Sequence, residues 1–201
     1  HCISSAASDV YKRQGFRAFF YHAGMEKVDK VNVQERFMSE DNIVICATIA
    51  FGMGIDKSNV RFVAHTSLPG SMENFYQEIG RAGRDGIDSD TLLIFGLQDL
   101  FQRRKWIYDS EASETFKIKE IKRLDSLMSY CDSATCRKQT LLSYFRETCD
   151  PCGKCDNCTN PPRMIEGTEY AQMAMSAIYR TGQSFGSCLL YTSDAADDMQ
   201  C

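Results

Sequence analysis

The sequence predicts an α/β lobe followed by a helical segment that contains a cysteine-rich loop. Four short runs in the first half are rich in apolar, β-branched or aromatic residues, which is typical of buried strands. These runs are residues 17–22, 43–48, 61–66 and 91–96. Helical patterns separate them, and strands that alternate with helices at this spacing predict a parallel sheet with right-handed crossovers.

The helices of the first half are predicted from spacing and from capping residues. Val33 and Phe37 lie four positions apart, so they share one face of a helix between the first two strands. Ser71 is a good N-cap residue and Glu73 follows it, which favours a second helix that ends near Gly80.

The second half contains helical patterns and no strand pattern. Apolar residues recur at helical spacing over 118–128 and again over 141–145. Asn160-Pro161-Pro162 cannot continue a helix, so a boundary is expected there. A new amphipathic helix is predicted from Thr168, and no internal repeat or low-complexity tract is present.

Both ends of the chain are predicted to be non-native. Residues 4–14 and 188–198 are the translations, in opposite orientations and different frames, of one oligonucleotide that resembles a sequencing-library adapter. We therefore assign residues 1–14 and 188–201 to adapter sequence and exclude them from fold reasoning. The natural insert is then about residues 15–187, and its own termini are expected to lie elsewhere.

Composition limits the classes of partner only weakly. The formal net charge is −4 over 201 residues, so bulk charge neither supports nor excludes a nucleic-acid partner. No stretch approaches 18 consecutive apolar residues, and we expect no membrane span and no membrane partner. Without the flanks seven cysteines remain, and four of them lie between Cys149 and Cys158, which favours a metal over disulfides.

The cysteine spacing strongly indicates a metal site. Cysteines at positions 149, 152, 155 and 158 repeat at CxxC spacing, which places paired thiolates on one ion. Ordering ten such residues costs roughly 10–20 kcal/mol, and a structural zinc supplies on the order of 10–16 kcal/mol. An iron–sulfur cluster is the alternative, but bacterial ferredoxins continue with x3-C-P, which is absent here. Colourless protein with zinc would exclude that cluster.

Two further motifs indicate phosphate chemistry. Residues 77–86, QEIGRAGRDG, place Arg81 and Arg84 three positions apart on one helical face, and arginine forks suit phosphate oxygens. Residues 47–57, ATIAFGMGIDK, follow a predicted strand, where an α/β sheet binds its ligands. The second motif is neither a P-loop nor a dinucleotide fingerprint. A glycine-capped helix end and an ordinary strand-to-helix turn are the plain alternatives.

Together with YHAGM at residues 21–25, these motifs resemble the RecQ family of superfamily 2 helicases in order and spacing. The resemblance extends over essentially all of residues 15–187. It implies a RecA-like second lobe at 15–98, a helical zinc-binding subdomain at 99–162, and the truncated start of a winged-helix domain at 163–187.

The resemblance also implies roles for single residues. Arg84 is the expected arginine finger and Arg81 assists at the ATP phosphates, so both are assigned to catalysis and to ATP binding. Gly54 and Asp56 belong to the motif that touches the nucleotide and couples it to DNA. Thr48 is a candidate contact to a DNA phosphate. His22 and His65 are expected to be packed residues without a chemical role.

The zinc ligands follow from the resemblance and not from spacing alone. Cys136-Arg137-Lys138, followed by LLSYF and CGxCDxC, resembles the RecQ zinc subdomain, in which one cysteine precedes a helix and three lie in a loop. The implied ligands are Cys136, Cys152, Cys155 and Cys158. Cys149 remains the rival for the place of Cys136, and Arg146 stands where the family usually has glycine.

The expected function is therefore 3′–5′ ATP-dependent DNA unwinding in repair and recombination, with ATP and magnesium in the intact enzyme and a structural zinc. The expected partners are DNA, ATP and the first helicase lobe, which this chain lacks, so the chain alone is expected not to hydrolyse ATP. The rival function is a non-enzymatic zinc-dependent DNA-binding module. A prokaryotic source would imply a cytoplasmic, nucleoid-associated protein. The basic clusters at 103–105 and 117–123 are expected to be solvated faces, with contact to DNA phosphates as the alternative. Trp106 is expected to be a core residue, with a base-stacking platform as the alternative.

Overall fold

A computed structural model describes residues 2–48, 51, 55–180 and 182. Gly54 and residues 188–201, for which the sequence makes predictions, lie outside the described residues. The chain divides into two compact units, residues 1–152 and 153–201. Within the described part, no helix is both long and apolar enough to cross a bilayer.

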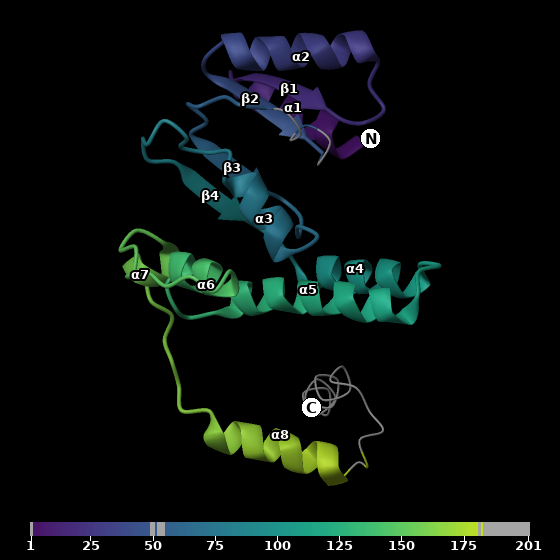
Figure 1. The fold of residues 1–201 in the computed structure, drawn as a ribbon, viewed down its shortest axis with the longest axis vertical. Coiled ribbons are helices and arrows are strands. Elements are labelled where there is room, and N and C mark those ends of the chain that lie inside the picture. Colours follow the sequence, from purple (N-terminus) through teal and green to yellow (C-terminus); the bar gives the residue numbers. More distant parts are fainter. Residues whose placement is uncertain (1, 49–50, 52–54, 181, 183–201) are drawn as a thin grey trace, which may run out of the picture. The chain divides into compact units, whose positions relative to one another are not determined.

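The four predicted strands are present, and their pairing is parallel (Figure 1). β1 (Arg17–Tyr21) pairs with β2 (Ile43–Ala47), with Arg17 opposite Ile43. β3 (Phe62–His65) pairs with β4 (Asp90–Leu93), with Phe62 opposite Asp90. Among the described residues the strands form two separate pairs and not one continuous sheet. The expected parallel α/β architecture is confirmed, and the carboxyl ends of paired strands lie together at one edge.

The helices of this lobe begin where the sequence indicates. α2 (Lys27–Ser39) lies between β1 and β2, and α3 (Met72–Ile79) lies between β3 and β4. The hydroxyl of Ser71 caps α3 by accepting from the backbone N–H of Asn74 at 3.3 Å. α1 (Cys2–Arg13) falls in the stretch assigned to adapter sequence and packs on β1; it carries no part of the site below.

The helical part of the first unit shares its core with α3. Three helices follow β4: α4 (Leu97–Asp109), α5 (Glu114–Asp132) and α6 (Arg137–Tyr144). Their buried leucines join apolar residues of the lobe in one cluster, made of Leu68, Met72, Phe75, Leu100, Leu124, Leu127 and Leu141. The last turn of α3 begins the arginine motif. This helix is therefore held by the same apolar contacts that hold the helical subdomain.

The expectation that Trp106 is a core residue was wrong. Its side chain is 61% exposed, whereas Leu100 on the same helix is buried. Leu100 and Ile107 face the core cluster, and Trp106 lies about 100° around the helix from Ile107. Trp106 therefore faces solvent, although its neighbour in sequence, Ile107, faces the core.

The second unit contains two described helices. α7 (Asp156–Thr159) is a single turn in the cysteine loop, and α8 (Thr168–Arg180) is the amphipathic helix predicted from Thr168. No side chain of α8 is buried.

The end of α6 has a backbone conformation that glycine prefers, but arginine occupies it. The N–H of Arg146 donates to the carbonyl of Ser143 and that of Glu147 donates to Leu142, both at 3.0 Å. This pair of bonds defines a Schellman motif, in which the residue at the position of Arg146 is left-handed and usually glycine. Arg146 has φ +64°.

We expect Arg146→Gly to raise the free energy of unfolding of the zinc-bound chain by about 0.5–1 kcal/mol. A left-handed non-glycine residue costs roughly 1–2 kcal/mol, and the greater entropy of glycine in the unfolded chain removes part of the gain. Urea unfolding monitored by circular dichroism measures the change. Arg146→Ala is the control, because alanine keeps the Cβ atom, and equal stability of the two variants would refute strain at this position.

Candidate functional site

The arginine motif ends in a loop that is fastened to the segment before β3. We call residues Gly80–Gly86 the finger loop. The N–H of Gly83 donates to the carbonyl of Val60 at 3.0 Å, and the N–H of Asp85 donates to Ser58 at 3.3 Å. These two bonds tie the motif that contains the arginines to the continuation of the motif that contains Asp56.

A side-chain ion pair strengthens this attachment. One nitrogen of the Arg61 guanidinium donates to both carboxylate oxygens of Asp85, at 2.7 and 2.6 Å, and another donates to the carbonyl of Asp88. The hydrogen bonds from Arg61 lower the pKa of the Asp85 carboxyl, so this residue stays ionised at neutral pH. The loop is thus held by charge-assisted bonds in addition to backbone bonds.

Gly83 is required by the shape of this loop. Its φ is +66°, and a Cβ atom there would lie 2.7 Å from the hydroxyl of Ser89 and 3.0 Å from the carbonyl of Ile87. Any other residue would have to move the backbone of the loop. Gly83 lies between the two arginines. Its backbone conformation therefore sets the direction in which the chain carries Arg84 away from the end of α3.

The two arginines have different surroundings. Arg84 donates to the Asp56 carboxylate at 2.5 Å and to the carbonyl of Gly80 at 3.3 Å, and its side chain is 39% exposed. Arg81 is half-buried, and no ion pair joins its guanidinium to another described residue. The structure thus brings Arg84 and Asp56 together in one ion pair. Both side chains are accessible to a ligand.

Thr48 lies at the carboxyl end of β2, next to the end of β1. Its N–H donates to the carbonyl of Tyr21 at 3.1 Å, and its side chain is exposed. The neighbouring YHAGM turn is closed by the N–H of Met25, which donates to His22. Gln34 of α2 donates to the Tyr21 hydroxyl at 3.2 Å.

His65 is packed, as the sequence predicts, and it is paired with Glu78. Its Nε2 lies 2.6 Å from a carboxylate oxygen of Glu78, and its ring lies 5.4 Å from that of Phe75. The pair joins the end of β3 to α3. It therefore helps to hold the helix that precedes the finger loop.

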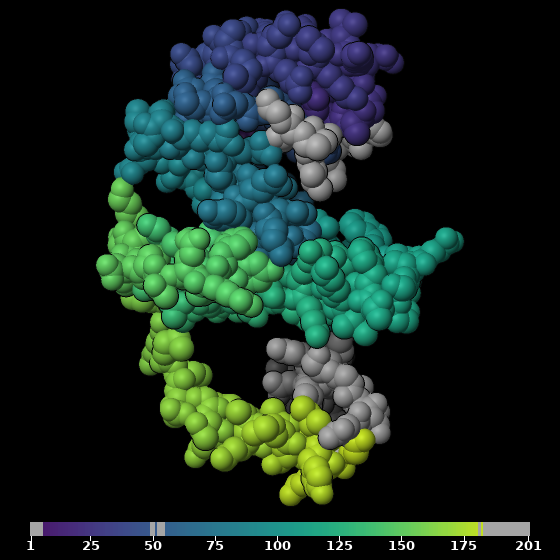
Figure 2. All heavy atoms as spheres, viewed as in Figure 1, coloured from purple at the N-terminus to yellow at the C-terminus, as the bar shows by residue number. Residues whose placement is uncertain are grey.

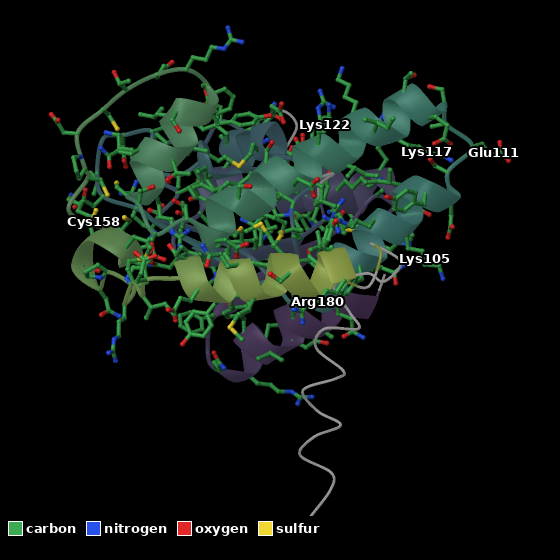
Figure 3. All side chains as sticks on the ribbon, turned by 90° about the horizontal axis from the view of Figure 1, so that it is seen from below. Lys105, Glu111, Lys117, Lys122, Cys158 and Arg180 are labelled. Atoms are coloured by element: carbon green, nitrogen blue, oxygen red, sulfur yellow. The ribbon has the colours of Figure 1, made fainter. Side chains whose placement is uncertain are left out.

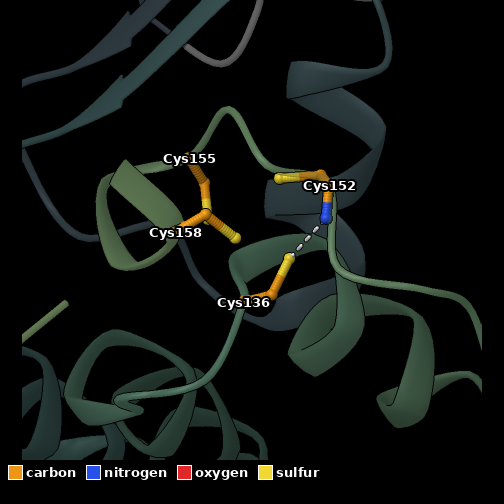
Figure 4. A group of neighbouring side chains, drawn as sticks. All are labelled: Cys136, Cys152, Cys155 and Cys158. Carbon is orange, nitrogen blue, oxygen red and sulfur yellow. Dashed lines mark hydrogen bonds between the residues drawn. The ribbon is translucent and has the colours of Figure 1, made fainter. Parts of the chain in front are cut away.

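Four cysteines form a compact sulfur cluster (Figure 4). The Sγ atoms of Cys136, Cys152, Cys155 and Cys158 all lie within 4.8 Å of one another. Sulfurs around a tetrahedral zinc lie about 3.8 Å apart, given Zn–S bonds of about 2.3 Å. The backbone N–H of Cys152 also donates to the sulfur of Cys136 at 3.2 Å, a bond that favours a thiolate. Four thiols in this arrangement fit one zinc ion.

The remaining cysteines near the module do not join this cluster. The sulfur of Cys149 is not part of the cluster, and the carbonyl of Cys149 accepts from the side chain of Gln139 at 2.9 Å. Cys131 lies at the end of α5, and burial raises its pKa to about 11, so it stays a neutral thiol. The four residues brought together are therefore those that include Cys136 and leave out Cys149.

The helix that begins after Cys136 ends against α3. The hydroxyl of Tyr144 donates to Oε1 of Glu73 at 2.8 Å, and the rings of Phe145 and Tyr76 lie 4.8 Å apart. Burial by itself raises the pKa of Glu73, but hydrogen bonds from Ser71 and Tyr144 outweigh it and the pKa is lowered. Figure 2 shows the atoms of α3 directly against those of α6.

Comparison with known proteins agrees with this pairing of a motor motif and a zinc module. Residues 97–159 match the RecQ zinc-binding family, and residues 3–86 match the helicase conserved C-terminal domain. The chain is 44% identical over 183 residues to the ATP-dependent DNA helicase RecQ of Haemophilus influenzae, and 43% identical over 180 residues to that of Bacillus subtilis. It is 43% identical over 159 residues to the ATP-dependent helicase SGS1 of Saccharomyces cerevisiae.

These matches cover 90%, 89% and 77% of this chain, respectively. The chain belongs to the RecQ family. It spans 29%, 30% and 11% of the length of those three relatives, so this RecQ chain corresponds to a part of each.

The basic clusters of the RecQ chain are partly paired within the protein, and Figure 3 labels three of their lysines, Lys105, Lys117 and Lys122. Arg103 donates twice to the carbonyl of Leu68, at 3.0 and 2.6 Å, and burial lowers its pKa. Arg104 pairs with Asp125 at 2.7 Å. Arg123 pairs with Glu120 and Lys117 with Glu114. Lys105 of α4 and Lys122 of α5 are exposed.

Sequence reasoning missed three residues that position this site: Arg61, Glu73 and Tyr144. Arg61 lies 24 residues before its partner Asp85, and Tyr144 lies 71 residues after Glu73. Each looks like an ordinary surface residue in the sequence. An acid within the arginine motif and a basic residue directly before β3, the strand that precedes the motif, were the signals present for the first pair.

Proposed function

We propose that the whole protein is a DNA helicase that unwinds duplexes 3′ to 5′ by hydrolysing ATP with magnesium. In this proposal the described lobe supplies Arg84 as the arginine finger. One observation carries it: Arg84 projects, 39% exposed, from a loop that Arg61, Asp85 and Gly83 hold in one conformation. A rigid loop with an accessible guanidinium suits stabilisation of charge on a transferred phosphoryl group.

The other site residues have matching roles. Arg81 would assist at the phosphates, and Gly54 and Asp56 would meet the nucleotide. The guanidinium of Arg84 donates to the carboxylate of Asp56. An incoming phosphate would compete for the same fork, because carboxylate and phosphate oxygens offer equivalent acceptors. Thr48 would bind a phosphate of one DNA strand. Closure of the two lobes around ATP would then move this contact along the strand.

The cysteine module has a structural role in this proposal. Zinc held by Cys136, Cys152, Cys155 and Cys158 would order a loop that offers little apolar surface. Four thiolate ligands leave no open position for water, which distinguishes a structural zinc from a catalytic one. We also propose that the whole protein works in DNA repair and recombination. In a prokaryote it would be cytoplasmic and associated with the nucleoid.

A non-enzymatic zinc-dependent DNA-binding module is the second candidate. The cluster of four thiols favours it, since a zinc module can bind DNA without a motor. The finger loop argues against it, because a degenerate lobe would not need the paired Arg61–Asp85 contact and the constrained Gly83.

We expect the chain by itself not to hydrolyse ATP. It has no phosphate-cradling P-loop and no acidic motif for magnesium, and both are needed for phosphoryl transfer. Phosphate release by purified chain, with and without single-stranded DNA, measures this directly. DNA-stimulated release clearly above a protein-free blank would contradict the two-lobe proposal.

A chimera tests the positive side of the proposal. Residues 15–180 of this chain replace the corresponding segment of the Haemophilus influenzae relative, so that the finger loop faces a complete first lobe. DNA-stimulated ATPase and strand separation by this chimera support the helicase. DNA binding without either activity would favour the zinc-dependent binding module.

A further inference from the structure

The helix α6 is fixed at both of its ends. Its N-terminal end belongs to the cysteine cluster, and its C-terminal end contacts α3. Cys136 is its N-cap residue and one of the four clustered thiols. The carbonyl of Cys136 accepts the first helical bond, from Thr140 at 3.0 Å. Eight residues later Tyr144 ends the helix against α3. A helix of this length is about 12 Å long and moves as one piece.

The contact between α6 and α3 is specific as well as apolar. Tyr144 donates to Glu73 at 2.8 Å, and the ring of Phe145 packs on Tyr76. Burial and the bond to Glu73 both raise the pKa of Tyr144, so its hydroxyl remains a proton donor at neutral pH. Hydrogen bonds to ionised acceptors are directional and stronger than neutral ones. This bond therefore sets the angle of α3 more narrowly than ring packing does.

The same face of α3 continues to the finger loop. Glu73, Tyr76 and Gly80 lie at spacings of three and four, so they form one line along the helix. The N–H of Gly80 donates to the carbonyl of Tyr76 at 2.9 Å. A rotation of α3 at Glu73 would thus be passed to Gly80, whose carbonyl accepts a hydrogen bond from Nε of Arg84 at 3.3 Å.

We propose that the Tyr144–Glu73 hydrogen bond is a positioning contact, through which the zinc-bound cysteine module sets the orientation of the helix that leads into the finger loop. The proposal rests on the assignment of Arg84 as arginine finger. Tyr144 and Glu73 are positioning residues in it and do not touch ATP. The zinc module then contributes to turnover as well as to stability.

The test uses the helicase chimera and removes one hydroxyl. Tyr144→Phe keeps the ring and its packing, so the protein should fold and bind one zinc. We expect kcat for DNA-stimulated ATP hydrolysis to fall about three- to tenfold, the range for a change in coupling between sites. The KM for ATP should change less than twofold, since the lost contact acts on the orientation of the finger and not on ground-state binding.

Four further variants make the outcome decisive. Glu73→Ala should lower kcat as Tyr144→Phe does, and the double variant should be no worse than either, because both remove one contact. Glu73→Gln keeps an acceptor and should restore much of the turnover. Tyr108→Phe removes a hydroxyl from an exposed tyrosine of α4 and should have no effect.

Unchanged kcat in zinc-bound Tyr144→Phe, or losses that add in the double variant, would overturn the positioning contact. Arg84→Ala in the same chimera separates this failure from failure of the proposed function. If Arg84→Ala abolishes turnover and Tyr144→Phe does not change it, only the positioning contact is wrong. If Arg84→Ala turns over normally, both proposals fall.

Discussion

Replacement of Arg84 by alanine in the chimera should lower kcat for DNA-stimulated ATP hydrolysis by about 10³–10⁵-fold. This corresponds to roughly 4–7 kcal/mol of transition-state stabilisation at about 1.36 kcal/mol per tenfold. An arginine finger meets charge that develops during phosphoryl transfer, so turnover should suffer more than ATP binding. Steady-state phosphate release against ATP concentration measures both quantities.

Arg84→Lys should be nearly as damaging as Arg84→Ala. Lysine keeps the positive charge but loses the planar fork that binds two oxygens at once. Binding of single-stranded DNA without nucleotide should survive both substitutions, because the finger meets ATP and not DNA. Fluorescence anisotropy of labelled DNA checks this.

Unfolding cannot account for such a loss. The Arg84–Asp56 pair lies at the surface, with side chains 39% and 84% exposed, and exposed pairs contribute about 0–1 kcal/mol to stability. Arg36 is a matched control: its side chain is also 39% exposed and pairs with one carboxylate, that of Glu40. Arg36→Ala should keep turnover within about twofold. Near-normal kcat in Arg84→Ala would show that Arg84 is not an arginine finger and that the finger loop only ends the helix.

The local part of the fold was predictable because it depends on short-range patterns. The four strands and the helices from Ser71 and Thr168 appear within a few residues of their predicted positions. Alternation, β-branched content and capping residues act over fewer than ten positions, so one sequence is enough to locate them. The division of the strands into two pairs depends on contacts between distant segments, which no local pattern records.

The site was predictable in its chemistry and not in its support. Cysteine spacing identified the metal module from the residues themselves. The arginine motif was also found, but the shared helical face predicted for Arg81 and Arg84 was wrong, because α3 ends at Ile79 and both arginines lie in the loop after it. The bonds Arg61–Asp85 and Tyr144–Glu73 join residues that are far apart in sequence and ordinary in type. The choice between Cys136 and Cys149 also lay beyond spacing, because thiols three apart look equally suited to one ion.

Loss of one zinc ligand should have the largest effect on folding. We expect Cys155→Ala to lose the metal and much of the folded stability of the cysteine module. A structural zinc contributes on the order of 10–16 kcal/mol in small metal-bound domains, and α7 offers no buried side chain in its place. Metal analysis of the purified variant, together with its thermal unfolding, measures both losses.

The ligand set itself is tested by a matched pair of substitutions. Cys136→Ala should lose zinc, because the Cys136 sulfur lies within 4.8 Å of the other three sulfurs in the cluster. Cys149→Ala should keep it, because Cys149 is half-buried but outside that cluster. If Cys136→Ala kept zinc and Cys149→Ala lost it, Cys149 would be the fourth ligand in place of Cys136. The assignment of a four-cysteine zinc module would still hold. A brown protein that contains iron would instead replace the zinc assignment altogether, because thiolate-bound iron–sulfur clusters absorb visible light and zinc does not.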